Sequence, residues 1–218
     1  RITMPGRVTV KCPLDKRLTV FLYGLMIITG LNAQWLEVQF DDNDMALDLT
    51  EAFTFQKYPT YDQYVEMMKY FATQNPTICK LDTFGTSVEG RLLLALKISD
   101  NVEQDEPEAQ FLYTSTIHGD ELVGFVLLLR LADTLLKGYG SDSELTGLVD
   151  SLTIWINPLA NPDGSYSRDN NTSLKNSTRK NVEGVDLNRN FPDPSVGEPD
   201  DTTGRALENK CMMQFLKE

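Results

Sequence analysis

The stretch that most limits what this chain can fold into is residues 111–130, FLYTSTIHGDELVGFVLLLR. Residues 111–117 are rich in β-branched and aromatic side chains, which favour a buried strand. Residues 122–136 are apolar nearly all round and long enough for a helix. A strand that passes through a polar turn into a helix indicates an α/β fold. In open α/β sheets the functional residues gather at the carboxyl ends of the strands, which is where this turn lies.

The turn itself is His-Gly-Asp-Glu, and His118 is the only histidine in the chain. An imidazole and the carboxylate of Glu121, three residues later, can converge on one cation. Zinc takes such ligands, and catalytic zinc sites typically use three protein ligands plus a water. Acids are common here, at 32 of 218 residues, so the spacing alone arises by chance about one time in seven. The alternative is an ordinary polar strand end, where the following helix favours a nearby carboxylate.

The other elements follow from periodicity. We expect further strands over residues 77–83, 91–99 and 152–157, and a last helix over 205–217. Thr60 and Gln63 form a capping-box start for an amphipathic helix that ends at Asn75 and Pro76. The strand–helix–strand passage from 111 to 157 predicts that part of the sheet is parallel. Charged residues interrupt the apolar helix 122–136, which favours a core helix over a membrane span.

Residues 158–190 form a long, mostly polar loop, of the kind that is usually functional or disordered. Pro162-Asp163-Gly164 predicts a turn inside it. Arg179 and Arg189 stand out in this loop because the chain as a whole carries a net charge of −12. That charge argues against nucleic-acid binding, which needs clustered Lys and Arg.

The first residues differ from the rest. Residues 1–33 combine basic residues with the apolar run 18–31 and a small-residue ending, a pattern typical of a secretory signal. The run is short for a span, and a membrane anchor is the alternative. We therefore expect a secreted protein (extracellular or periplasmic) with no stable membrane insertion after signal removal. Residues 34–57 are rich in acids, and we expect them to form an extended, solvated lead-in to the globular domain. Cys79 and Cys211 allow either a disulfide or two free thiols.

Three motifs together resemble one known family. They are HGDE (118–121), NPLANPDG (157–164) and RKNVEGVDLNRNFPD (179–193). This set resembles the zinc metallocarboxypeptidases, within them the branch of carboxypeptidases N, E and D. TFGTSVEGRLLLALKIS (83–99) and Asp120 are also similar to that branch. The resemblance implies a mixed, partly parallel sheet with helices on both faces, and a monomer. It covers residues 58–218, which would be a catalytic domain truncated at its C-terminal end.

The resemblance also implies roles. His118 and Glu121 would be two of three ligands to Zn²⁺, and Asp186 would accept the other ring proton of His118. Arg179 would polarise the scissile carbonyl, and Asn188 and Arg189 would hold the terminal carboxylate of a peptide or protein substrate. The chemistry suits these residue types, because a guanidinium binds a carboxylate at two points where lysine acts as a point charge.

The departure from the family pattern is the missing third ligand. A histidine should follow helix 205–217, and a general-base glutamate should come later still. Their absence indicates either that this chain is an inactive fragment of a longer enzyme or that the protein has lost its site. The intact remainder of the site favours the fragment. Two other readings are an aspartoacylase-like zinc amidohydrolase, which shares the fold and similar motifs, and a secreted non-catalytic binding module. The complete GVDLNRNFPD with Arg179 at its spacing favours the carboxypeptidase.

Overall fold

The computed structural model describes residues 42–166, 170–195 and 197–217, so the expected signal at 1–33 and the start of the lead-in lie outside the described residues. The described part contains a four-stranded sheet with the order β1-β2-β4-β3. Its strands are β1 (Cys79–Thr86), β2 (Leu92–Ile98), β3 (Ala109–Thr114) and β4 (Leu152–Asn157). β2 pairs antiparallel with both β1 and β4, whereas β3 and β4 are parallel. The predicted mixed, partly parallel sheet is confirmed.

The parallel pair is joined by the predicted crossover. The chain leaves β3, runs through α4 (Val123–Gly138) and the short α5 (Ser143–Val149), and returns as β4. Because parallel strands end at the same edge of a sheet, the turns after β3 and β4 meet. Ser115 N donates to Asn157 O at 3.0 Å, and Ala160 N donates to Ser115 O at 3.0 Å. This edge carries the HGDE turn.

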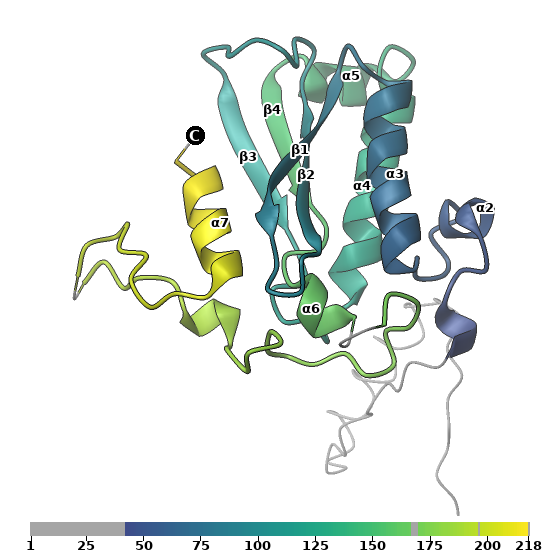
Figure 1. The fold of residues 1–218 in the computed structure, drawn as a ribbon. Helices are drawn as coiled ribbons and strands as arrows, with labels where there is room; N and C mark the ends of the chain where they lie inside the picture. Colours follow the sequence, from purple (N-terminus) through teal and green to yellow (C-terminus); the bar gives the residue numbers. More distant parts are fainter. Residues whose placement is uncertain (1–41, 167–169, 196, 218) are drawn as a thin grey trace, which may run out of the picture. The chain divides into compact units, whose positions relative to one another are not determined.

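Helices cover both faces of the sheet, as the resemblance implied. α3 (Tyr61–Gln74) and α4 lie against one face and α7 (Leu207–Phe215) against the other (Figure 1). α3 begins with the predicted capping box, in which Gln63 N donates to Thr60 Oγ1 and Thr60 N donates to Gln63 Oε1. The main core lies between α3, α4 and the sheet. Its fully buried side chains include Tyr64, Met67, Phe71, Leu94, Phe125, Leu129 and Ile156.

The lead-in differs from its prediction. From residue 42 it is not extended, because it contains η1 (Asp42–Asp44) and α2 (Leu49–Ala52). Nor is it fully solvated, because Met45, Ala46 and Ala52 are buried in the core. The physical reason is that a few apolar residues among the acids dock on α3 while the acids face outward. Gln63 Nε2 fixes this contact by donating to Ala46 O at 3.3 Å.

β3, the strand that precedes the HGDE turn, was predicted to be buried, but it is largely exposed. Phe111 and Tyr113 in β3 are each 48% exposed. The reason is the strand order, because within the described residues β3 is an edge strand and pairs only with β4. Its aromatic side chains line a groove with Leu131, Leu135, Leu148, Leu152 and Ile154.

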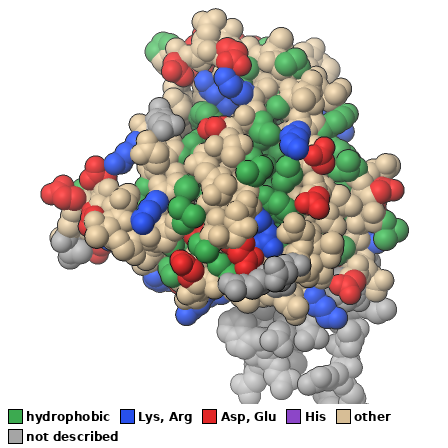
Figure 2. Space-filling model, viewed as in Figure 1, with side chains coloured by type: hydrophobic (Ala, Val, Ile, Leu, Met, Phe, Trp, Pro, Cys, Tyr) green, Lys and Arg blue, Asp and Glu red, His purple; other side chains and the backbone are tan. Residues whose placement is uncertain are grey.

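The region predicted as a long polar loop contains two short helices, α6 (Pro162–Ser165) and η2 (Leu187–Arg189). The expected turn at residues 162–164 is present as α6, but all four of its residues are buried. Both described cysteines are free thiols, which decides the question left open by the sequence. No helix in the described ranges is long and apolar enough to cross a membrane. Acidic and basic side chains are interspersed on the face shown in Figure 2.

Candidate functional site

The HGDE turn brings His118 and Glu121 onto the same side of the chain. Glu121 N donates to His118 O at 3.0 Å, closing a tight turn. His118 is buried, whereas the Glu121 side chain is 62% exposed. His118 Nδ1 lies 3.0 Å from Glu121 Oε1. The turn therefore places one buried nitrogen and one accessible carboxylate side by side at the sheet edge.

The other ring nitrogen of His118 faces Asp186. His118 Nε2 lies 3.2 Å from Asp186 Oδ1, the contact that the resemblance implied. Asp186 is brought here as the N-cap residue of η2, where its Oδ1 also accepts Asn188 N at 3.1 Å. This carboxylate therefore fixes both the orientation of the ring and the start of the short helix.

Arg179 lies between the two acids. Its Nε donates to Asp186 Oδ2 at 2.9 Å, and its Nη1 lies 3.8 Å from Glu121 Oε1. Partial desolvation would raise the pKa of Asp186. The hydrogen bond and charge of Arg179, together with His118, outweigh that effect and lower the pKa below its ordinary value. Asp186 therefore remains an anion that can hold the imidazole.

The remaining two predicted residues lie beside this group. Asn188 and Arg189 are exposed, and Arg189 Nη1 donates to Asn188 O at 2.9 Å. Their link to the cluster is through Asn188 N, which donates to Asp186. The structure thus brings His118, Glu121, Asp186 and Arg179 into direct contact, with Asn188 and Arg189 adjoining on η2.

The segment that carries Arg179 and Asp186 is held by a buried asparagine. Asn181 Oδ1 accepts the backbone N–H groups of Glu183 and Val185, and its Nδ2 donates to Glu208 Oε2 at 3.1 Å. Asn209 Nδ2, also on α7, donates to Leu187 O at 3.0 Å. Two side chains of α7 therefore hold the loop that carries Arg179 and Asp186.

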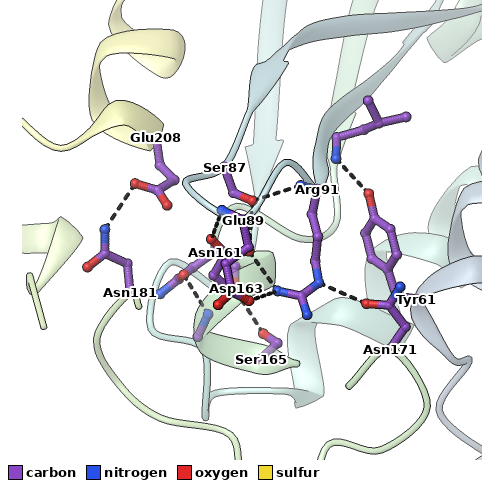
Figure 3. A network of polar contacts seen from close by, with 12 residues as sticks. Tyr61, Ser87, Glu89, Arg91, Asn161, Asp163, Ser165, Asn171, Asn181 and Glu208 are labelled. Carbon is purple, nitrogen blue, oxygen red and sulfur yellow. Dashed lines mark hydrogen bonds and ion pairs between the residues drawn. The ribbon is translucent and has the colours of Figure 1, made fainter. Parts of the chain in front are cut away.

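Residues that the sequence did not single out form a buried network behind the turn (Figure 3). Arg91 Nη1 lies 2.7 Å from Asp163 Oδ1 and 2.9 Å from Glu89 Oε2. Arg91 Nε also donates to Asn171 Oδ1 at 3.0 Å. The signals available were the NPDG turn and the VEGR run, but neither showed that the two charges meet in the interior.

The residues fit a zinc ion. His118 Nδ1 is buried and has no hydrogen-bond partner within the described residues, because its contact with Glu121 lacks hydrogen-bond geometry. Two ligands on one tetrahedral zinc lie about 3.3 Å apart, given bond lengths of about 2.0–2.2 Å. The observed separation of 3.0 Å is close to that value. A separate group of three carboxylates, Asp100, Glu106 and Glu108, includes none of the residues predicted for the site.

The structure is an α/β domain with a cluster of His, Glu, Asp and Arg side chains at one edge of its sheet, and comparison with known proteins identifies its family. The zinc carboxypeptidase family model matches residues 64–215, and the chain belongs to that family. Carboxypeptidase D of Rattus norvegicus is 43% identical over 151 residues, which are 69% of this chain and 11% of that protein. Carboxypeptidase M of Mus musculus is 35% identical over 176 residues, 79% of this chain and 38% of that protein.

Solved structures agree on the fold. A crystal structure of thrombin activatable fibrinolysis inhibitor superposes with a TM-score of 0.65 at 21% identity, covering 80% of this chain and 47% of that one. The chain thus spans about half of this solved relative, and less of the two curated ones. The resemblance stated from the motifs is confirmed at the level of family and fold.

Proposed function

We propose that this domain belongs to a zinc-dependent carboxypeptidase, which removes C-terminal residues from peptides or proteins. The observation that supports it most is the orphaned Nδ1 of His118 facing Glu121 while Asp186 holds the opposite ring nitrogen. A metal-binding histidine is oriented in this way in other proteins, by a carboxylate on its second nitrogen.

Each residue has a distinct task in this proposal. His118 and Glu121 would hold zinc, which when bound supplies the Lewis acidity that activates water and polarises the carbonyl. Asp186 keeps the proton of His118 on Nε2. Arg179, beside Glu121, would stabilise negative charge that develops on the carbonyl oxygen. Asn188 and Arg189 would bind the free carboxylate of the substrate.

The same proposal includes a third zinc ligand and a general base outside the present 218 residues, because His118 is the only histidine among them. Two protein ligands are fewer than a catalytic site uses. A missing base typically costs 10²–10⁴-fold in rate. We also propose secretion, which rests on the pattern of residues 1–33 alone.

The test is a pair of peptides that differ only in a free or an amidated C-terminus. They are assayed with the full reading frame that contains this sequence and, in parallel, with the 218-residue chain after signal removal. We expect the full frame to cleave only the free peptide and to lose activity with a chelator. The shorter chain should show no cleavage and only weak zinc binding in calorimetry. Equal cleavage of both peptides, or indifference to the chelator, contradicts the proposal.

An aspartoacylase-like amidohydrolase predicts a different result. Such an enzyme would cleave a small N-acyl amino acid and leave the peptide untouched. A binding module would do neither, but would still retain the peptide with a free C-terminus. The same two peptides and one N-acyl amino acid therefore separate all three readings.

A further inference from the structure

The interior of the domain holds an ion pair that the proposed chemistry does not use. The side chains of Arg91 and Asp163 are 7% and 0% exposed, and their Nη1 and Oδ1 atoms are 2.7 Å apart. Both oxygens of Asp163 have further partners, because Ser87 Oγ donates to Oδ1 at 2.7 Å and Glu89 N donates to Oδ2 at 2.9 Å. The carboxylate is thus fixed at two atoms against the loop between β1 and β2.

A buried ion pair is an expensive way to add stability. Removing two charges from water costs several kcal/mol per ion, and well-packed apolar residues of similar volume are often as stable or more so. The alternative, that the pair only stabilises the fold, leaves its position unexplained. Asp163 lies in α6, and this short helix together with its N-cap residue Asn161 contacts the backbone on both sides of His118.

Two side chains of the α6 turn make that contact. Asn161 Nδ2 donates to Ile117 O at 3.2 Å, and Ser165 Oγ donates to Gly119 O at 2.9 Å. The carbonyl groups before and after His118 are therefore held by the N-cap residue of α6 and by its last residue, respectively. The contact is also tight, because a Cβ atom added at Gly119 would lie 2.1 Å from the backbone carbon of Gly164.

The backbone before His118 is strained and needs such support. Thr116 has a φ of 59°, which is unfavourable for a β-branched residue. Conformations of this kind persist only where the surroundings over-determine them. Asn161 N donates to Thr116 O at 3.1 Å, so the α6 turn again supplies the restraint.

The same turn also reaches the segment of Arg179. Gly164 O accepts Thr178 N at 2.7 Å, and Gly119 N donates to Arg179 O at 3.4 Å. One four-residue helix therefore contacts both the turn with the proposed metal ligands and the loop segment with the proposed oxyanion group.

We propose that Arg91 and Asp163 are positioning residues for this site. The ion pair anchors α6 to the β1–β2 loop. Asn161 and Ser165 are thereby held in the positions from which their hydrogen bonds fix the backbone of residues 116–119. They contact neither the substrate nor the metal in this account. The inference rests on the proposed function only for its zinc measurement, because the placement of His118 can be read without zinc.

The experiment exploits the single histidine of the chain. Ring ¹⁵N labelling gives NMR signals for His118 alone, whose shifts and line widths report its surroundings, and calorimetry with zinc gives an affinity. Asp163→Asn keeps the shape of the side chain but removes one of the two carboxylate charges that face Arg91, leaving that of Glu89. Arg91→Lys keeps the charge but loses the donor to Asn171. Leu135→Ala is the control, because it removes a buried side chain at the far end of α4.

All variants are compared under conditions in which they are fully folded. We expect Asp163→Asn to shift or split the His118 ring signals and to weaken zinc binding about tenfold, at the lower end of the range for outer partners of metal ligands. Arg91→Lys should have a smaller effect in the same direction. Leu135→Ala should lose stability while its His118 signals and zinc affinity stay at wild-type values.

The proposal is overturned if Asp163→Asn leaves the His118 signals unchanged, or if Leu135→Ala changes them equally. If Asp163→Asn does not fold, Ser165→Ala decides the matter, because it removes the hydrogen bond to Gly119 O and, besides that, one bond within the α6 turn, to Asn161 O. Unchanged ring signals in that variant also overturn the proposal. If the wild-type chain binds zinc too weakly for calorimetry, because the third ligand proposed for the site lies outside these 218 residues, the ring signals alone decide whether Arg91 and Asp163 position His118.

Discussion

At the scale of single residues, Arg179 and Arg189 carry similar charges in different surroundings. The guanidinium of Arg179 lies between Asp186 and Glu121, beside the proposed metal, whereas Arg189 lies at the end of η2. Replacing the two arginines should therefore change different kinetic parameters.

We predict that Arg179→Ala lowers kcat and kcat/KM together, by roughly 10²–10³, because its charge acts mainly in the transition state. Arg189→Lys should instead raise KM with little change in kcat, because lysine loses the two-point grip on a carboxylate. Steady-state kinetics of the enzyme expressed from the full reading frame measure kcat and KM for both variants. A rise in KM alone for Arg179→Ala would show that its role is substrate binding.

Cys79 provides a prediction about alkaline pH. Burial raises the pKa of its thiol from the ordinary 9.0 to about 12. The unfolded chain therefore loses this proton first, and the stability that the buried thiol contributes is lost as pH rises from about 9 to 12. Between about pH 8 and pH 10.5 the free energy of unfolding should fall about 2 kcal/mol more in the wild type than in Cys79→Ala.

Denaturant unfolding at the two pH values measures this difference. The buried tyrosines titrate in both proteins, so they cancel in the comparison. Equal pH dependence in the wild type and in Cys79→Ala would mean that the Cys79 thiol is exposed to solvent.

At the scale of elements, the contact between the HGDE turn and α6 depends on two glycines. We predict that Gly119→Ala lowers the stability and displaces the turn, because its Cβ would overlap the Gly164 backbone. Gly147→Ala in α5 is the matched control, because no atom of the described residues lies within 4 Å of its added Cβ apart from its own chain neighbours and helix backbone. That control should be stabilised by about 0.5–1 kcal/mol. Thermal unfolding and the His118 ring signals compare the two, and an unchanged Gly119→Ala would show that the turn has room to move.

At the scale of the whole molecule, the exposed edge of the sheet is the largest liability of the described chain. β3 offers an unpaired edge with Phe111 and Tyr113 half exposed. Such edges pair with other chains, and a lysine there discourages this. We predict concentration-dependent self-association of the 218-residue chain, reduced by Phe111→Lys. Leu47→Lys, at an 86% exposed position outside the sheet, should have no effect. Sedimentation velocity over a range of concentrations measures this, and a monomer at all concentrations contradicts it.

The order of the elements could be predicted from the sequence because it depends on local patterns. The capping box at Thr60, the four strands and the crossover through α4 follow from periodicity and from short-range hydrogen bonds. His118 and Glu121 could be predicted as a pair because a turn three residues long leaves little freedom in their spacing. The motifs added Asp186, and the structure places it on His118 Nε2.

Tertiary structure alone decided which side chains are buried and which charges meet. β3 has the composition of a buried strand, but its exposure depends on its place at the edge of the sheet, which no local pattern encodes. Asp163 is of a residue type common in turns, yet it is buried because Arg91, 72 positions earlier, neutralises it. A sequence specifies local conformation through neighbouring residues, whereas the partner of a buried charge is fixed only when distant segments pack together.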